Sequence, residues 1–336
     1  MTALTYQTLE LRLRHTFRIA HGASDTRQNV ILRLGDGLGE AAPVAYHGES
    51  AAGVIAALER WRPELERLDD PAAIVWLMQR LEGSRAAHAA VDIALHDWLG
   101  KRLNTPLNRL LGLAALPLPP TSFTIAIAEG ADLIARVREA AAYPILKVKL
   151  GTPRDLELVE TVRAAAPAAT IRVDANAAWS APQALAIVPR LAELGVELVE
   201  QPLPSDDHDG WQRLRAACLP VPIVADESIK SAADVARWAP VVDGVNIKLM
   251  KSGGISGALA AIHTARAHGL RVMLGCMVET SLGVTAAAHL GGLADWLDLD
   301  GPLLIADDPF VGVSYAGARL ELPTGTGLGV SPRAPH

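Results

Sequence analysis

The stretch TIRVDANAAWSAPQALAIVPRLAELGVELVE (Thr170–Glu200) contains one complete strand–helix–strand unit. Thr170–Asp174 is a short apolar run that ends on a carboxylate, and Glu197–Glu200 is a second run of the same kind. Between them, the apolar residues of Pro182–Leu194 recur at helical spacing. The unit therefore predicts two buried strands joined by an amphipathic helix, with a charged group at the C-terminal end of each strand.

The same unit recurs along the chain. The step from Asp174 to Glu200 is 26 residues, the step from Glu200 to Asp226 is again 26, and Lys248 follows after 22. Lys147 and Lys149 occupy the corresponding place one unit earlier. The expected strands are Thr121–Ile127, Ile145–Leu150, Thr170–Asp174, Glu197–Glu200, Pro222–Asp226, Gly244–Leu249, Arg271–Cys276 and Trp296–Leu299.

Strands that alternate with helices of this length predict a parallel sheet with right-handed crossovers. Eight units close such a sheet into a (β/α)8 barrel, whose active site lies at the C-terminal ends of the strands. An open doubly wound sheet is the alternative. It normally carries a glycine-rich turn after its first strand, and none follows Thr121–Ile127.

The first hundred residues have a different pattern. TLELRLRHTF and NVILRLGDGLGEAAP alternate apolar and polar residues around a Gly-Asp-Gly turn, which indicates antiparallel strands. Helical periodicity follows in Ala51–Leu68, Pro71–Leu81 and Ser84–Leu99. We expect an α+β capping domain over residues 1–115, the barrel over 116–309, and a C-terminal segment, 310–336, that packs back on the capping domain.

Composition limits the function. The chain has 336 residues, of which 50% are hydrophobic, and a net charge of -6. Such a chain can build a large core and offers no basic surface for nucleic acid. Two cysteines exclude a disulfide framework, and no apolar run approaches the ~18 residues of a membrane span. We expect a cytoplasmic protein with a small-molecule partner; a homo-oligomer is among the states that the sequence allows.

The charged strand ends predict a metal site between two bases. Three carboxylates, on the third, fourth and fifth strands, favour a hard cation such as Mg²⁺, one per subunit. Strands two and six are opposed in an eight-stranded barrel, so Lys149 and Lys248 approach the axis from opposite sides. Taken one by one, these charged residues could be solvated loop residues or helix caps. Their even placement on consecutive strands argues against that interpretation.

This arrangement suits proton transfer next to a carboxylate. Removing that proton gives an enediolate, whose negative charge a magnesium ion stabilises. A lysine acts as the base if its pKa falls, and Lys147 beside Lys149 and Lys251 near Lys248 are the cationic neighbours expected to lower it. A base on each face allows racemisation or epimerisation.

The motifs KVK, DAN, EQP, DES and NIKLMKSGG together resemble the enolase superfamily, in its muconate-lactonizing subgroup. The resemblance covers essentially the whole chain, including the capping domain and GTGLGV (Gly325–Val330). It implies Lys149 and Lys248 as acid–base catalysts and Lys147 as a contact for the substrate carboxylate. It further implies Asp174, Glu200 and Asp226 as Mg²⁺ ligands, with Asn176 and Glu227 in support.

The eighth strand narrows the class of substrate. In WLDLDGP, Asp298 and Asp300 are two residues apart and face the same side, which favours a clamp for an α-ammonium group. Two solvated loop aspartates are the alternative. The pair resembles that of dipeptide epimerases, which hold the amino terminus of an L,L-dipeptide and invert its second residue. We also expect Cys276, Met277 and Ser122 to contact the substrate.

Side-chain specificity is expected from two capping loops, Arg18–Arg27 and Tyr46–Ser50. The resemblance implies an arginine in the first loop of Ala-Glu epimerases, but an alignment through Phe17 places Gly22 or Ser24 there. Asp25 and Glu49 are instead candidates to contact a polar or cationic side chain. The sequence therefore does not decide which dipeptide side chains are preferred.

Two other functions stay open. One keeps the barrel but changes the reaction to that of o-succinylbenzoate synthase, N-succinylamino acid racemase or muconate cycloisomerase. These enzymes act on substrates without a free ammonium group, so Asp298 and Asp300 would have no evident role. The other is a metal-binding barrel without catalysis, against which the full set of lysines and carboxylates argues.

Overall fold

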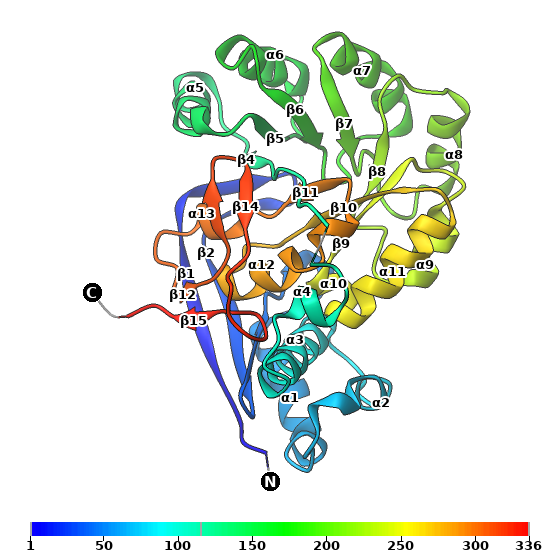
Figure 1. The fold of residues 1–336 in the computed structure, drawn as a ribbon. Coiled ribbons are helices and arrows are strands. Elements are labelled where there is room, and N and C mark those ends of the chain that lie inside the picture. Colours follow the sequence, from blue (N-terminus) through cyan, green and yellow to red (C-terminus); the bar gives the residue numbers. More distant parts are fainter. Residues whose placement is uncertain (1, 115, 335–336) are drawn as a thin grey trace.

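The computed structural model describes residues 2–114 and 116–334, and it contains a closed barrel with a capping domain on one side (Figure 1). The eight-stranded sheet has the order β11-β10-β9-β8-β7-β6-β5-β4, and all its pairs are parallel. A bridge between Thr121 and Leu297 joins its two edges. The predicted (β/α)8 barrel is confirmed. None of the described helices has the length and apolar character needed to cross a membrane.

The barrel strands agree closely with the predicted runs. They are β4 (Phe123–Ile125), β5 (Ile145–Lys149), β6 (Thr170–Asp174), β7 (Val196–Glu200), β8 (Ile223–Ala225), β9 (Gly244–Lys248), β10 (Arg271–Gly275) and β11 (Trp296–Asp298). The helices between them are α5 (Gly130–Glu139), α6 (Asp155–Ala165), α7 (Ala181–Glu193), α8 (His208–Ala216), α9 (Ala232–Trp238), α10 (Leu249–Ser252), α11 (Ile255–Ala267) and α12 (Ser281–Ala288). After β11, α13 (Gly301–Leu304) has only four residues.

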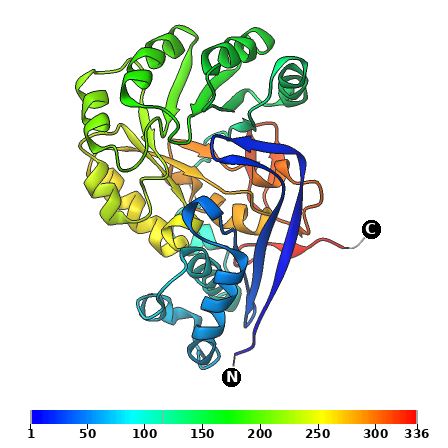
Figure 2. The same cartoon turned by 180° about the vertical axis from the view of Figure 1, so that it is seen from behind.

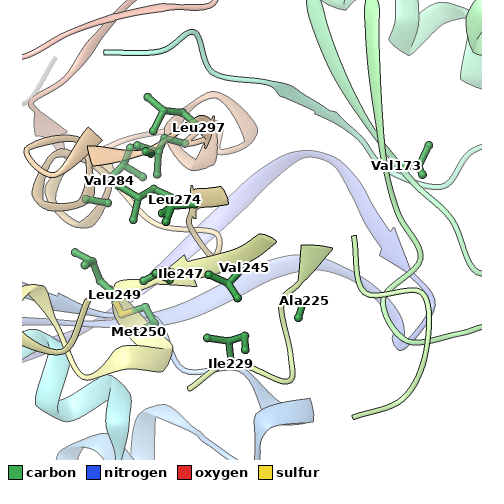
Figure 3. Packing of buried hydrophobic residues seen from close by; sticks show 14 of the residues in the cluster. Val173, Ala225, Ile229, Val245, Ile247, Leu249, Met250, Leu274, Val284 and Leu297 are labelled. Carbon is green, nitrogen blue, oxygen red and sulfur yellow. The ribbon is translucent and has the colours of Figure 1, made fainter. Parts of the chain in front are cut away.

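Side chains along each barrel strand alternate between the outer core and the interior. Val245 and Ile247 of β9 join the apolar cluster between strands and helices, which Figure 3 shows from close by. The interior carries a small apolar cluster of its own. Its members are Leu198, Val224, Met273 and Trp296. Three of them stand two residues before Glu200, Asp226 and Asp298, so this apolar layer lies directly beneath the charged one.

The capping domain combines an antiparallel sheet with helices. Its strands are β1 (Leu4–Ile19), β2 (Gly22–Leu34) and β3 (Gly37–Ala41). Its helical segments are η1 (Ala45–His47), α1 (Ala51–Leu65), η2 (Pro71–Ala73), α2 (Ile74–Met78), α3 (Arg85–Arg102) and α4 (Leu107–Leu110). β3 lies against α3 so closely that a Cβ on Gly37 or Gly39 would stand 1.9 Å from a helix carbonyl oxygen. Close packing therefore explains the second and third glycines of GDGLG, Gly37 and Gly39.

The β1–β2 hairpin crosses from the capping domain to the mouth of the barrel (Figure 2). Its strands continue to Ile19 and resume at Gly22, so most of the predicted loop Arg18–Arg27 is regular hairpin. The backbone N–H of Ile127, which follows β4, donates to the carbonyl of Arg18 at 3.0 Å. The hairpin tip is thereby attached to the barrel at the C-terminal ends of its strands.

The C-terminal segment forms two short pairs, β12 (Phe310–Val311) with β15 (Ser331–Pro332) and β13 (Ser314–Ala316) with β14 (Arg319–Glu321). Between β14 and β15 the segment reaches the capping helices. Leu107 N–H donates to the carbonyl of Gly327 at 2.8 Å. The domain limits 1–115, 116–309 and 310–336 stay a prediction.

Asp97 of α3 connects three parts of the chain. Its buried carboxylate accepts hydrogen bonds from Leu328 N–H (2.8 Å), Leu38 N–H (2.9 Å) and Lys101 Nζ (2.6 Å). Asp97→Ala leaves two buried backbone donors without a partner, and we expect it to lower the free energy of unfolding by about 3 kcal/mol.

Urea denaturation measures this difference, with Asp206→Ala, an exposed aspartate, as the matched control. A loss below about 1 kcal/mol would show that water replaces Asp97 and that the C-terminal segment does not depend on it.

Candidate active site

Three carboxylates converge inside the barrel mouth. Asp174 ends β6, Glu200 ends β7 and Asp226 follows β8, and all three are buried. One oxygen from each lies within 4.8 Å of the others. This is the geometry expected from carboxylates at the ends of consecutive parallel strands.

The backbone turns sharply after the first two carboxylates. Asn176 (φ 44°) and Gln201 (φ 36°) adopt the left-handed conformation, which is uncommon outside glycine and clusters at functional sites. The side-chain amide of Gln201 accepts a hydrogen bond from Asp226 N–H at 2.8 Å. Asn176 Nδ2 donates to Glu227 at 3.1 Å. These contacts fix the three ligand-bearing turns to one another.

Lysines occupy the space around the carboxylates. Lys147 Nζ lies 2.8 Å from Glu200, 3.2 Å from Asp174 and 2.6 Å from Asp298. Lys149 Nζ donates to Asp174 at 2.6 Å. Each lysine therefore partly neutralises the negative charge that the strand ends bring together.

Lys248 approaches from the opposite strand, β9, and its Nζ lies 2.8 Å from Asp226. Lys251 also pairs with Asp226, through both the side chain and the carbonyl oxygen. Gly275 on the neighbouring strand leaves room for Lys248, because a Cβ there would stand 3.1 Å from its Cε. The absence of a side chain at Gly275 thus helps to set the position of Lys248.

The pKa values of the buried carboxyl groups shift in opposite directions. Burial raises the pKa of Glu200 to about 8, and the charges of Asp174 and Asp226 add to the rise. Burial also opposes ionisation of Asp226, but Lys248 and Lys251 outweigh it and hold its pKa below the ordinary value. The three buried carboxylates repel one another, and this repulsion favours a bound cation.

The pKa of Lys248 differs from the expectation. Burial lowers the pKa of Lys248, yet the charge of Asp226 outweighs burial and raises it well above the ordinary value. The expected cationic neighbour, Lys251, lies on the far side of that carboxylate. A cation bound to Asp226 would oppose this pull, since it withdraws the negative charge that Lys248 faces.

The residues fit a hard divalent cation. Glu200 Oε2 and Asp226 Oδ2 are buried and accept no hydrogen bond, although Lys147 Nζ and Lys248 Nζ lie 2.8 Å away. Oxygen atoms from Asp174, Glu200 and Asp226 form a set that Mg²⁺ prefers, with room in its coordination sphere for substrate oxygens.

Asp298 and Asp300 lie on another side of the same cavity. Ser122 Oγ donates to Asp298 at 2.6 Å, and the backbone N–H of Thr124 donates to Asp300 at 2.6 Å. Burial raises the pKa of Asp300 to about 6, and the charge of Asp298 adds to the rise. Two neighbouring buried carboxylates favour a positively charged ligand.

A central cavity brings together six of the predicted site residues. Lys149, Lys248, Cys276, Met277, Asp298 and Asp300 line it. Lys147 lies beneath, and its side chain is 1% exposed. Ser122 contacts Asp298 from behind rather than lining the cavity.

Asp25 and Glu49 stand elsewhere among the described residues. Asp25 accepts a hydrogen bond from Thr16 Oγ1 at 2.6 Å on the exposed side of the hairpin. Glu49 accepts from Ser84 Oγ (2.8 Å) and Ala86 N–H (3.1 Å), so it caps the start of α3. Neither lines the central cavity, because each carboxylate is engaged in local structure.

The sequence indicated two capping loops at the cavity but not the individual capping residues that line it. Phe17, Ile19 and Arg27 of the hairpin line it, with Val44 and Tyr46 from the following segment. The Tyr46 ring is stacked on His21, with ring centroids 5.1 Å apart. No periodicity marks these positions, because they meet the barrel only through tertiary packing.

Comparison with known proteins identifies the family. The model of the mandelate racemase/muconate lactonizing enzyme N-terminal domain matches residues 3–112, and that of the enolase C-terminal domain-like family matches residues 129–335. The chain belongs to this family of the enolase superfamily, as its motifs predicted.

Named relatives are similar over nearly the whole chain. An L-Ala-D/L-amino acid epimerase from Maribacter sp. is 38% identical over 96% of each chain. A dipeptide epimerase from Enterococcus faecalis, solved with Mg and L-Leu-L-Tyr, is 32% identical over 98% of each chain, with a TM-score of 0.92. The L-Ala-D/L-Glu epimerase from Bacillus subtilis, solved with substrate, is 31% identical over 99% of each chain, with a TM-score of 0.93.

We expect Mg²⁺ to stabilise the fold through the three carboxylates. At a hundredfold excess over its Kd the gain is about 2.7 kcal/mol. Thermal denaturation with Mg²⁺ and with a chelator measures the shift. Glu200→Gln should abolish most of it, whereas Glu279→Gln, a buried carboxyl outside the triad, should retain it. An equal Mg²⁺-dependent shift in both variants would contradict the assignment.

Proposed function

We propose that this protein is a Mg²⁺-dependent dipeptide epimerase that inverts the α-carbon of the second residue by a two-base 1,1-proton transfer. The observation that carries the proposal is the Asp298–Asp300 pair in the same cavity as Lys149 and Lys248. That cavity offers a site for an ammonium group and acid–base groups from opposed strands. The activities of the named relatives support the same reaction.

Asp174, Glu200 and Asp226 are the residues that would hold one Mg²⁺ per subunit. The ion supplies positive charge next to the substrate carboxylate, where negative charge grows as the α-proton leaves. Lys147 now pairs with two of these carboxylates and with Asp298. With a cation held on Asp174 and Glu200, Lys147 would be released from these two and would donate to the substrate carboxylate.

Lys149 and Lys248 carry the proton transfer. One lysine, as the neutral amine, accepts the α-proton from its face of the substrate. The other, as an ammonium, donates a proton to the same carbon from the opposite face. One proton is removed and one is returned, so the configuration inverts and the two lysines exchange protonation states.

The Asp298–Asp300 pair holds the amino terminus. A free ammonium group placed there keeps the peptide extended across the cavity toward the lysines. Cys276 and Met277 line the cavity beside the peptide backbone. Ser122 acts indirectly, since its hydroxyl donates to Asp298. A succinylated amine or a muconate would bring no positive charge to this pair, which disfavours the other reactions of the superfamily.

The proposed partner is the dipeptide alone, without nucleic acid or a membrane. We also propose a cytoplasmic location, because Cys218 and Cys276 are free thiols, as is usual in a reducing compartment.

We expect Lys149→Ala and Lys248→Ala each to lower epimerisation by a factor of about 10² to 10⁴. Mass spectrometry in deuterated water, on a library of L,L-dipeptides, measures α-proton exchange. Each variant should lose exchange from one stereoisomer of the second residue and retain it from the other, because only one face loses its base.

Lys230→Ala is the matched control, since Lys230 does not line the central cavity. If no L,L-dipeptide gains mass with the unchanged protein, the proposed function is wrong. Loss of exchange from both stereoisomers in both lysine variants would contradict the two-base assignment.

Dipeptide affinity should depend on pH through Asp300. The pKa of this group is raised to about 6, so it is ionised above that pH and binds the ammonium. Affinity should fall as the pH drops through about 6. Asp300→Asn should weaken binding about tenfold or more and remove this dependence. Calorimetry on the epimerisation-deficient Lys149→Ala protein, at saturating Mg²⁺, measures it. A pH dependence unchanged by Asp300→Asn would contradict the clamp.

A further inference from the structure

A second cavity, here called the side pocket, lies next to the central one between β1, β4, α5 and α13. Its volume is about 310 Å³, at the lower end of the range for small-molecule sites. The apolar residues that line it are Phe17, Phe123, Ile125, Tyr143, Leu303 and Leu304. Nothing in the proposed proton transfer uses this space.

Two stacked aromatic rings line the side pocket. The rings of Phe123 and Tyr143 stack, with centroids 4.6 Å apart and planes at 22°. Both residues are half-buried, so part of each remains available to a ligand. An apolar, flat surface of this kind favours a bulky aliphatic or aromatic group.

The side pocket adjoins the proposed amino-terminal clamp. Phe17, Thr124 and Leu304 line both cavities. The backbone N–H of Thr124 donates to Asp300 at 2.6 Å. Burial raises the pKa of Tyr143, and the charge of Asp300 adds to the rise.

Polar contacts close the outer rim of the side pocket. His15 Nε2 lies 2.7 Å from Glu139, and Arg136 donates to the carbonyl of Thr16 at 3.3 Å. These contacts join the end of β1 to α5. Arg14 also lines the pocket and donates to the carbonyl of Leu303 at 3.1 Å. These charged groups thus have protein partners, and we assign the apolar side chains to the ligand.

We propose that the side pocket binds the side chain of the first residue of the dipeptide and selects a large apolar or aromatic one. The inference rests on the proposed function, since it requires the ammonium group at Asp298 and Asp300. The first α-carbon is one bond from that ammonium, so its side chain starts beside the wall shared by the two cavities. An alanine methyl group would leave most of the pocket unfilled.

The test compares dipeptides that differ only in the first residue. We expect L-Phe-L-Xaa and L-Leu-L-Xaa to exceed L-Ala-L-Xaa in kcat/KM for α-proton exchange by about tenfold or more, for a second residue Xaa that the library shows to be accepted. Phe123→Ala, which enlarges the pocket and removes one ring, and Leu303→Trp, which fills it, should each reduce this ratio at least fivefold.

Trp76→Ala is the control, because Trp76 is an exposed aromatic residue of the capping domain; it should leave the ratio unchanged. If exchange occurs but alanine-first dipeptides are preferred for every second residue, the side-pocket inference is overturned while the proposed function stands. If both pocket variants lower all rates equally, the pocket is structural and the inference is again overturned. Absence of exchange from every dipeptide removes both proposals together.

Discussion

The balance of buried charge at the barrel mouth is the constraint on which this structure depends. Parallel strands bring Asp174, Glu200 and Asp226 together, and burial makes their repulsion costly. Four lysines reduce that cost directly: Lys147 and Lys149 from β5, Lys248 from β9 and Lys251 from α10. A bound cation would take over part of this role and release Lys147 and Lys248 for work on a substrate. The same lysines and carboxylates thus form ion pairs with one another in the protein without ligands and would contact the ion and the substrate in the proposed complex.

The barrel strands hold the proposed catalytic groups in place, and the capping domain forms part of the wall of the central cavity. Strand alternation places the charged layer above an apolar one, to which β7, β8, β10 and β11 contribute, so the ends of these strands are held by a packed interior. The β1–β2 hairpin spans the distance from the capping sheet to this layer and contributes Phe17 to both the central cavity and the side pocket. Substrate choice is therefore separable from proton transfer, since different parts of the chain carry them.

The sequence predicts what depends on local periodicity. Apolar runs located all eight barrel strands, and a charge at the end of a run located Asp174, Glu200 and Lys248. Alternation also placed Asp298 and Asp300 on one side of β11, and both line the central cavity. Prediction failed where position follows from packing between distant segments. Glu49 faces the start of α3 instead of the central cavity, and nothing in YHGES indicates that choice. Lys147 likewise pairs with carboxylates from three other strands, which no local pattern reveals.

A crystal structure of the Lys149→Ala protein with Mg²⁺ and an accepted L,L-dipeptide tests the central claim most directly. We expect the ion on Asp174, Glu200 and Asp226, the dipeptide ammonium on Asp298 and Asp300, and Lys147 moved from Glu200 to the substrate carboxylate. Lys248 should then face the α-carbon of the second residue. An ion bound elsewhere, or Lys147 still paired with Glu200 beside a bound dipeptide, would contradict it.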